Sequence, residues 1–322
     1  MEYPIDGIIL IDKDEGETSY DVVRKVKSSL GGGKVQKVGH AGTLDPFATG
    51  LLIILLGQGT KLSQYIMSGD KVYLATMRLG VETDTLDLTG KVARTSNVPD
   101  LKREYIQDKA KGFIGVIEQV PPIYSAVKYK GTRAYRLARK GVEVDLKKKT
   151  VTIYSIRIHS VDLPDVTMEV KCSSGTYIRK LAADLGRELG SVSHLKSLRR
   201  LASGSFAVQN ALNSKEILTK HTHCVLMDKV IPLRSALPEM REIEIEDLLA
   251  EKVRHGYQPT REELPKSLTL PDHRQERVYD VENHKDSNVK LVSNGKLVAI
   301  VRVKKIEYAG YDKVKLVRVF HS

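Results

Sequence analysis

Cysteine is scarce in this sequence, and long apolar runs are missing from it. Its two cysteines, Cys172 and Cys224, cannot build a disulfide framework, which fits a reducing compartment. The longest apolar run, residues 51–56, is too short to cross a membrane. The opening residues, MEYPIDGIILIDKDEG, are acidic and lack the features of a secretory signal. These absences predict a cytoplasmic protein that does not bind membranes.

Length and composition describe an ordinary folded protein. A chain of 322 residues gives a prior of about two domains, each large enough for its own core. With 41% hydrophobic and 29% charged residues, long disorder, collagen-like repeats and disulfide miniproteins are excluded. His221, His223 and Cys224 lie close together, but no second pair of ligands stands at zinc-site spacing, so we expect no metal.

The charge balance favours a polyanionic partner. The sequence has 52 Lys and Arg against 40 Asp and Glu, a net charge of +12. Nucleic acid is the leading candidate, and the alternative is the mild basicity of many soluble proteins. Residues 290–322 contain eight basic and two acidic residues, which gives this short segment a local charge of +6.

The apolar pattern predicts an α+β fold with a mixed, largely antiparallel sheet and flanking helices, since no regular βαβα alternation is visible. Thr18 and Asp21 are typical of a helix cap, before a helix with Val22, Val26 and Leu30 on one face. Residues 176–189 have the spacing of a second amphipathic helix. Strands are expected at residues 7–11, 51–56, 71–79, 151–158 and 166–172.

The composition of the sequence changes near residue 240, where a proline and alternating acidic residues precede a proline-containing loop region. Beyond it, residues 289–292, 297–303 and 314–320 read as short strands, with a turn at Asn294-Gly295. We therefore expect a body at residues 1–239 and a small β-barrel-like module at residues 240–322.

One segment, VGHAGTLDPFATGLL at residues 38–52, stands out for chemistry. It combines three glycines, His40 and an Asp45-Pro46 pair between a basic approach and a buried strand. Its glycines indicate a backbone that bends or lets a ligand come close. Asp-Pro is also a common turn starter, and a lone loop aspartate is usually structural. The combination is far less common than its parts.

This segment resembles the signature GHxGxLDPxATG of the TruB family of bacterial tRNA pseudouridine-55 synthases. Other segments resemble family motifs in the same order: Asp12-Lys13 with Gly16, Thr18-Ser19 and Asp21-Val22-Val23; Lys71-Val72-Tyr73; Arg78-Leu79-Gly80 with Thr83-Asp84-Thr85 and Asp87; Pro121 to Lys128; Cys172 to Arg179; and Leu198-Arg199-Arg200-Leu201. Asp14 departs from the pattern, since the family usually has proline there. The matches span residues 7 to about 210. By analogy with the family, residues 240–322 are expected to form a PUA-like RNA-binding domain.

The resemblance implies a pseudouridine synthase that isomerises uridine 55 in the T-loop of tRNA. Breaking the glycosidic bond and rejoining the same uracil through C5 needs no redox cofactor, metal or external nucleotide, so we expect no cofactor. Asp45 is the expected catalytic carboxylate, either as a nucleophile or as the base that removes the ribose C2′ proton. Arg179 is the expected cation that holds Asp45 ionised.

The family also suggests how the target base is held. The base lies inside a folded loop and must be flipped out and stacked. Tyr73 resembles the residue that stacks on it and assists proton transfer, and His40 resembles one that fills its vacated place. Tyr177 and Leu198 resemble residues that line the pocket. A core role is the alternative for Tyr73 and Leu198, and a solvated side chain is the alternative for Lys13 and Lys61, which also sit in family-like contexts.

Two other functions stay open. A catalytically silent RNA-binding or RNA-folding protein could keep the same fold and basic surface, although Asp45, Tyr73 and Arg179 argue against it. A guide-RNA-dependent relative is the nearer rival. Residues 80–134 resemble the long charged insertion of the bacterial form, which favours guide-independent recognition of the tRNA T-arm. We therefore expect a monomer with no obligatory protein partner.

Overall fold

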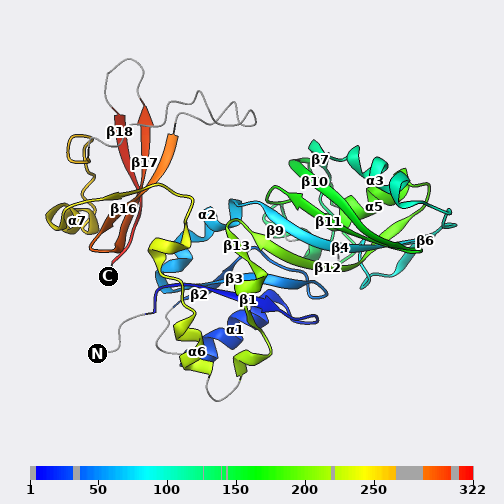
Figure 1. The fold of residues 1–322 in the computed structure, drawn as a ribbon, viewed down its shortest axis with the longest axis horizontal. Helices are drawn as coiled ribbons and strands as arrows, with labels where there is room; N and C mark the ends of the chain where they lie inside the picture. Colours follow the sequence, from blue (N-terminus) through cyan, green and yellow to red (C-terminus); the bar gives the residue numbers. More distant parts are fainter. Residues whose placement is uncertain are drawn as a thin grey trace.

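The computed structural model describes residues 5–31, 37–125, 127–138, 140–142, 144–218, 222–265, 286–305 and 312–321. The molecule is elongated, with a large sheet in its body and a smaller, four-stranded sheet at one end (Figure 1). Most neighbouring strands are antiparallel, with parallel pairs only at β1–β14, β3–β12 and β15–β16 among the described strands. The predicted α+β class with a largely antiparallel sheet is confirmed.

The large sheet has ten strands, and its main path runs β14-β1-β3-β12-β4-β11-β10-β7. Their bounds are β1 (Gly7–Lys13), β2 (Val38–Ala41), β3 (Thr49–Leu56), β4 (Lys71–Leu79), β7 (Gly115–Gln119), β10 (Lys149–Asp162), β11 (Asp165–Cys172), β12 (Ser193–Ser203), β13 (Phe206–Ala207) and β14 (Leu212–Asn213). All five predicted strands of the body are present.

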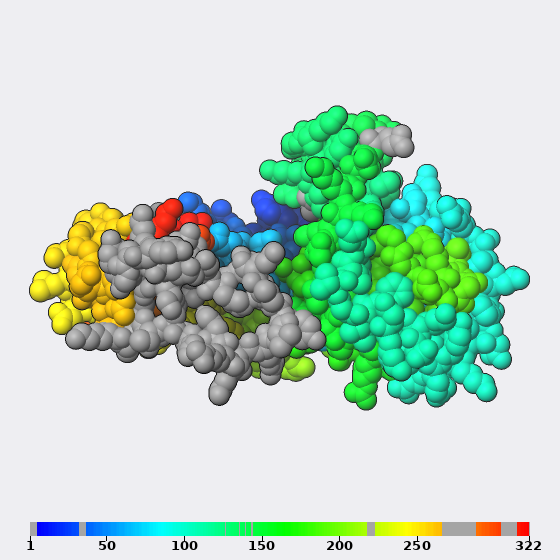
Figure 2. Space-filling view, turned by 90° about the horizontal axis from the view of Figure 1, so that it is seen from above, coloured from blue at the N-terminus to red at the C-terminus, as the bar shows by residue number. Residues whose placement is uncertain are grey.

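Helices and short hairpins complete the molecule. The helices are α1 (Ser19–Ser29), α2 (Ser63–Ser68), α3 (Arg103–Lys111), α4 (Ala134–Ala138), α5 (Ile178–Glu188), α6 (Thr222–Asp228) and α7 (Asp247–Arg254). The hairpins pair β5 (Val81–Thr83) with β6 (Val92–Thr95), and β8 (Lys128–Tyr129) with β9 (Thr132–Arg133). The described residues between 127 and 146, green in Figure 2, stand out from the body around a small hydrophobic cluster of their own.

Strands β1 and β3 are buried on both faces, which explains why they read as unbroken apolar runs. In β1, Ile9 and Ile11 join one hydrophobic cluster with the helices α1, α3 and α5. Ile8 and Leu10, on the opposite face, join a second cluster. Since successive side chains of a strand point to opposite faces, such a strand must be apolar at every position.

Helix α1 begins where its cap was predicted. The Thr18 hydroxyl accepts from the Asp21 backbone, and the Asp21 carboxylate accepts from the Thr18 backbone at 2.9 Å. The predicted apolar face of Val22, Val26 and Leu30 is fully buried. Helix α5 also agrees with its prediction, and its apolar face packs on β12.

The C-terminal sheet contains the three predicted strands and one more. Its order is β15 (Glu242–Glu244), β16 (Asp286–Ser293), β17 (Lys296–Lys305) and β18 (Asp312–Val319). The predicted turn at Asn294-Gly295 has φ values of 49° and 74°. This sheet has its own hydrophobic cluster, but Ile300 and Phe320 belong to the cluster that also contains Ile8. The boundary at residue 240 stays a prediction.

None of the helices described here is long and apolar enough to span a bilayer.

Candidate active site

Asp45 lies in the loop between β2 and β3, at the first position of a tight turn. The Ala48 amide donates to the Asp45 carbonyl at 3.0 Å, and Pro46 supplies the φ that the second turn position favours. The turn is held on both sides. Leu44 exchanges two hydrogen bonds with the Ser19 hydroxyl, and the Pro46 carbonyl accepts from the Gly16 amide at 2.8 Å. The Asp45 backbone is therefore fixed, while its side chain is 38% exposed.

Lys13 is completely buried beside this turn, contrary to the solvated alternative. Its ammonium donates to the carbonyls of Asp14 at 2.8 Å, Glu17 at 2.7 Å and Pro46 at 3.2 Å. Burial lowers its pKa to about 8, because the charged form loses solvation. Lys13 thus ties the end of β1 to the residue that follows Asp45.

Replacing Lys13 with methionine is expected to destabilise the fold. The substitution keeps the chain length but leaves three carbonyls without their shared donor. We expect the free energy of unfolding to fall by about 1–3 kcal/mol, measured by urea denaturation. Lys111→Met, on the exposed end of α3, is the matched control, and a loss equal to that of the control would contradict the structural role.

The pH dependence gives a second check on Lys13. Its folded pKa is about 8 against an ordinary value of 10.5, so between these values the unfolded chain binds more protons. The contribution of Lys13 to stability therefore rises as pH increases from about 8 towards 10.5. This rise should be missing from Lys13→Met.

Arg179 is buried and makes contacts with all three of its guanidinium nitrogens. Its Nε lies 3.1 Å from Asp45 Oδ2, and its Nη1 lies 3.0 Å from Asp87 Oδ2. Nη1 also donates to the Thr85 carbonyl, and Nη2 donates to the Tyr124 carbonyl, both at 3.0 Å. A rigid planar group with this many partners has one orientation. The predicted pairing of Arg179 with Asp45 is present.

The pKa of Asp45 is raised overall, whereas the sequence predicts that a cation lowers it. Burial raises the pKa of Asp45 above its ordinary value, because the ionised form loses solvation. Arg179 and Lys13 lower this pKa, and the negative charge of Asp87 raises it. Arg179 does favour the ionised form, as predicted, but it opposes a larger effect of burial.

Asp87 is the principal site residue whose role the sequence did not reveal. It is buried, and its Oδ1 accepts from the Thr89 amide at 2.9 Å and from the hydroxyls of Thr85 and Thr89. Its other oxygen faces Arg179. Asp87 therefore fixes the guanidinium that in turn contacts Asp45. Asp87 belongs to a motif that resembles the family, and this motif could have marked it as a site residue. The sequence did not show that its partner is Arg179.

Arg200 explains two glycines of the segment at residues 38–52. It is buried and donates to the carbonyls of Leu51 at 2.6 Å and Gly42 at 2.9 Å. Gly50 has a φ of +100°, and a Cβ there would collide with the Arg200 backbone. The glycines therefore let strand β12 pack closely against the loop that carries Asp45.

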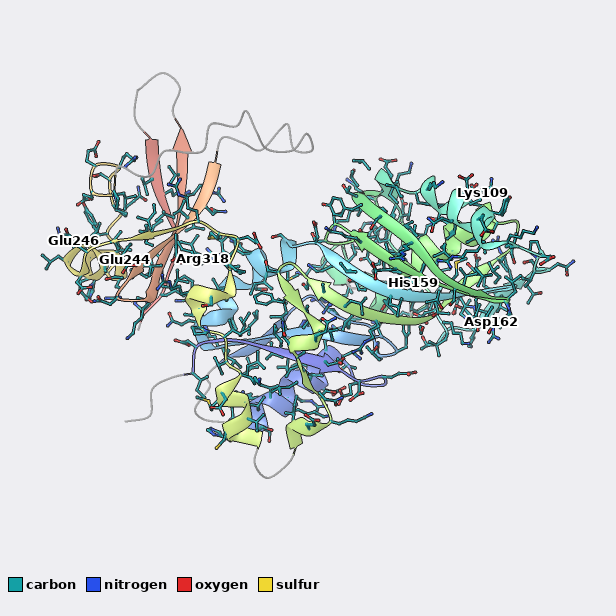
Figure 3. All side chains as sticks on the ribbon, in the orientation of Figure 1. Lys109, His159, Asp162, Glu244, Glu246 and Arg318 are labelled. Carbon is teal, nitrogen blue, oxygen red and sulfur yellow. The ribbon has the colours of Figure 1, made fainter. Side chains whose placement is uncertain are left out.

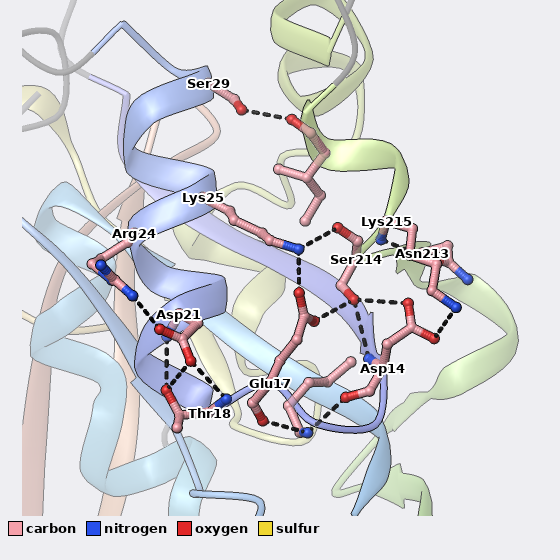
Figure 4. Close-up of polar contacts among 12 residues, drawn as sticks. Asp14, Glu17, Thr18, Asp21, Arg24, Lys25, Ser29, Asn213, Ser214 and Lys215 are labelled. Carbon is pink, nitrogen blue, oxygen red and sulfur yellow. Dashed lines mark hydrogen bonds and ion pairs between the residues drawn. The ribbon is translucent and has the colours of Figure 1, made fainter. Parts of the chain in front are cut away.

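The opening segment also contacts β12. Arg199 binds the Asp12 carboxylate with two nitrogens, at 2.9 and 2.6 Å. Asp14, which replaces the family's usual proline, donates its backbone amide to the Ser214 hydroxyl at 3.0 Å, and proline has no such donor (Figure 4). Figure 4 shows Ser214 bridging Asp14 and Glu17 beside α1.

The other predicted site residues lie on the same group of elements. Tyr73 in β4 is directly opposite Arg200 in β12, and burial raises the pKa of its hydroxyl, on which Asp45 also acts. Tyr177 immediately precedes α5, and burial raises its pKa, with a further contribution from Asp45. Both phenols are therefore within electrostatic reach of the carboxylate and stay protonated near neutral pH.

His40 and Leu198 are placed differently. His40 lies in β2, and its Nδ1 is buried with no hydrogen-bond partner among the described residues. Burial, together with the positive charge of Arg200, lowers its pKa. The ring is therefore neutral near pH 7. Leu198 is only 8% exposed and belongs to the main hydrophobic cluster, in agreement with the core alternative. Any contact of either residue with substrate stays a proposal.

The sequence is similar to that of known proteins over most of its length. Residues 29–178 match the family model described as TruB family pseudouridylate synthase (N terminal domain). A protein of Syntrophus aciditrophicus called tRNA pseudouridine synthase B is 40% identical over 99% of both chains. One of the same name from Clostridium kluyveri is 43% identical over 78% of this chain and 84% of its own.

Solved structures show the same fold. The crystal structure of a Cbf5-Nop10-Gar1 complex contains a chain that superposes with a TM-score of 0.68 at 24% identity, covering 98% of this chain and 84% of that one. At that identity the likeness concerns the fold alone. The full-length match to the Syntrophus protein, together with the family model, shows that this chain belongs to the TruB family of pseudouridine synthases.

Proposed function

We propose that this protein isomerises uridine 55 in the T-loop of tRNA to pseudouridine without a guide RNA. The observation that carries the proposal is the half-exposed Asp45 carboxylate held against Arg179, whose other nitrogens are fixed by Asp87, Thr85 and Tyr124. The relatives called tRNA pseudouridine synthase B support tRNA as the substrate.

The arrangement suits chemistry on a flipped-out uridine. Asp45 offers one ionisable oxygen to the sugar or base, as nucleophile or as base. In this proposal Tyr73 stacks on the extruded base, Tyr177 and Leu198 line its pocket, and the neutral His40 fills the vacated place in the RNA. The bond broken at N1 and the bond formed at C5 belong to the same uracil, so no redox cofactor or metal enters the scheme.

The remaining expectations concern partners and organisation. We propose that residues 240–322 act as a PUA-like RNA-binding domain beside a catalytic domain at residues 1–239. The local charge of +6 over residues 290–322 supports contact with the tRNA arm. We further propose a cytoplasmic monomer with no obligatory protein partner.

Incubation with an unmodified tRNA transcript tests the function. Pseudouridine should form at position 55 with enzyme alone, and a transcript with cytidine at that position should stay unmodified. No product with enzyme in excess would favour the catalytically silent alternative. Product that appears only after a guide RNA and partner proteins are added would favour the guide-dependent rival.

Replacing Tyr73 with phenylalanine separates stacking from proton transfer. The variant keeps the ring but removes the hydroxyl that lies within electrostatic reach of Asp45. We expect single-turnover rates to fall by about 10²-fold, the lower range for a proton-transfer group, with little change in tRNA affinity. A wild-type rate would leave only the stacking role for Tyr73.

A further inference from the structure

The backbone of Tyr177 is held by a side chain from a distant part of the chain. The Tyr177 amide donates to Oε1 of Gln119 at 3.0 Å, and Nε2 of Gln119 donates to the Tyr177 carbonyl at 3.4 Å. Gln119 is the last residue of β7, 58 residues earlier, and it is only 2% exposed. Both ends of its amide group are therefore used on one backbone position, largely shielded from water.

This contact replaces a helix cap that the local sequence does not provide. Tyr177 is the N-cap residue of α5, and its side chain makes no capping hydrogen bond. In a capping box, the third residue of the helix accepts a hydrogen bond from the N-cap amide. In α5 that residue is Lys180, whose ammonium cannot accept. Gln119 supplies the acceptor instead, so a tyrosine can stand where serine, threonine or aspartate is usual.

The chain that follows Gln119 also holds Arg179. The carbonyl of Tyr124 accepts from Nη2 of Arg179 at 3.0 Å. Arg179 is the second residue of α5, and its Nε lies 3.1 Å from the Asp45 carboxylate. The start of α5 therefore carries two side chains of the candidate site, and the segment after β7 contacts it at both.

Of these two side chains, Tyr177 depends more on Gln119. The guanidinium of Arg179 is also bound by Asp87 and by the Thr85 carbonyl. The Tyr177 carbonyl accepts from the Leu181 amide at 3.0 Å, a bond within the helix, but the Tyr177 amide donates to Gln119. Loss of the Gln119 amide should therefore displace Tyr177 and leave the guanidinium close to its place.

We propose that Gln119 is a positioning residue for pseudouridine formation, which holds Tyr177 at the correct place beside the extruded uracil. The inference rests on the proposed function, in which Tyr177 lines the pocket of the extruded base. Gln119 acts through Tyr177 and does not itself touch the reacting atoms. Its contribution is to geometry, and a misplacement of about 1 Å lowers a catalysed rate by about 10²-fold.

Gln119→Met tests this role, because it keeps the length of the side chain and removes the amide. We expect the single-turnover rate at saturating enzyme to fall at least about tenfold. The Kd for unmodified tRNA should stay within about twofold, because no charge is removed. Gln119→Asn, whose amide sits on a side chain one methylene shorter, should show the same separation of rate from affinity, and it serves if the methionine variant does not fold.

Gln107 in α3 provides a matched control, because its amide also holds backbone on both sides. Its Nε2 donates to the Ile156 carbonyl at 3.0 Å, and its Oε1 accepts from the Ile158 amide at 2.9 Å. Figure 3 shows Lys109, in the same helix, at the end of the molecule away from the C-terminal sheet. Gln107→Met should lower the Tm, as Gln119→Met does, but keep the wild-type rate.

Combination with Tyr177→Ala shows whether Gln119 acts through the ring. Once the ring is gone, adding Gln119→Met should lower the rate by less than about twofold more. The same fold-loss in both backgrounds would mean that Gln119 only supports the fold, and would overturn the proposal. A wild-type rate for Gln119→Met, or an equal loss of rate in Gln107→Met, would also overturn it.

Failure of the proposed function gives a different result. Wild-type protein that forms no pseudouridine would refute that function and, with it, the positioning role of Gln119. Unchanged rates for the Gln119 variants of an active wild type would refute the positioning role alone.

Discussion

Asp45→Asn is expected to abolish pseudouridine formation while tRNA binding persists. The amide has the shape of the carboxylate but can neither add to a sugar or base nor accept a proton near neutral pH. We expect the single-turnover rate to fall by at least about 10³-fold. Arg179 keeps its contacts with Asp87, Thr85 and Tyr124, so the surrounding geometry should survive.

The binding measurement makes this prediction specific. Removing a negative charge beside an RNA polyanion cannot weaken the electrostatic attraction, so the Kd should stay within about twofold or fall. Asp84→Asn, at an exposed position in the loop that follows β5, is a matched control with the same chemical change and should keep its activity. A rate above about one per cent of wild type in Asp45→Asn would remove Asp45 from the catalytic role.

Much of the fold could be predicted because its core strands are chemically uniform. β1 and β3 are apolar at nearly every position, since both of their faces are buried. β12 was not predicted as a strand, although it lies between β3 and β4. It carries Arg199 and Arg200, which break the apolar pattern. Their partners include groups far away in the chain: the Asp12 carboxylate for Arg199, and the carbonyls of Leu51 and Gly42 for Arg200.

Individual residues of the candidate site could be predicted from the sequence, but the contacts between them could not. Asp45 and Arg179 could be selected from motifs that resemble the family, and the structure brings them to 3.1 Å. Asp87 sits in a loop rich in threonine and aspartate that reads as solvated surface. Its significance depends on Arg179, 92 residues later in the chain, and local sequence carries no information about such a pairing. Lys13 was selected from its family-like context, but its buried role could not be predicted, because its partners are backbone carbonyls that any residue type supplies.

Arg179→Gln and Asp87→Asn are expected to move the acid limb of the pH profile in opposite directions. Asp45 must be ionised in either catalytic role, so activity falls as pH drops through its pKa. Arg179 lowers that pKa and Asp87 raises it. Without the guanidinium, the acid limb of kcat/KM should move to higher pH by at least about one unit, together with a large loss of rate. Without the charge of Asp87, the limb should move to lower pH.

The opposite signs distinguish electrostatics from simple disruption of the site. Both variants remove one partner from the same buried ion pair, so both should lose stability, and misplacement of Asp45 alone would lower the rate equally at every pH. The limb is measured as kcat/KM between about pH 4 and 7, which reports the free enzyme. In Asp87→Asn, Arg179 still has Asp45 and the carbonyls of Thr85 and Tyr124 to hold it, so measurable activity should remain. Shifts in the same direction for both variants would mean that neither charge acts on Asp45 as the geometry indicates.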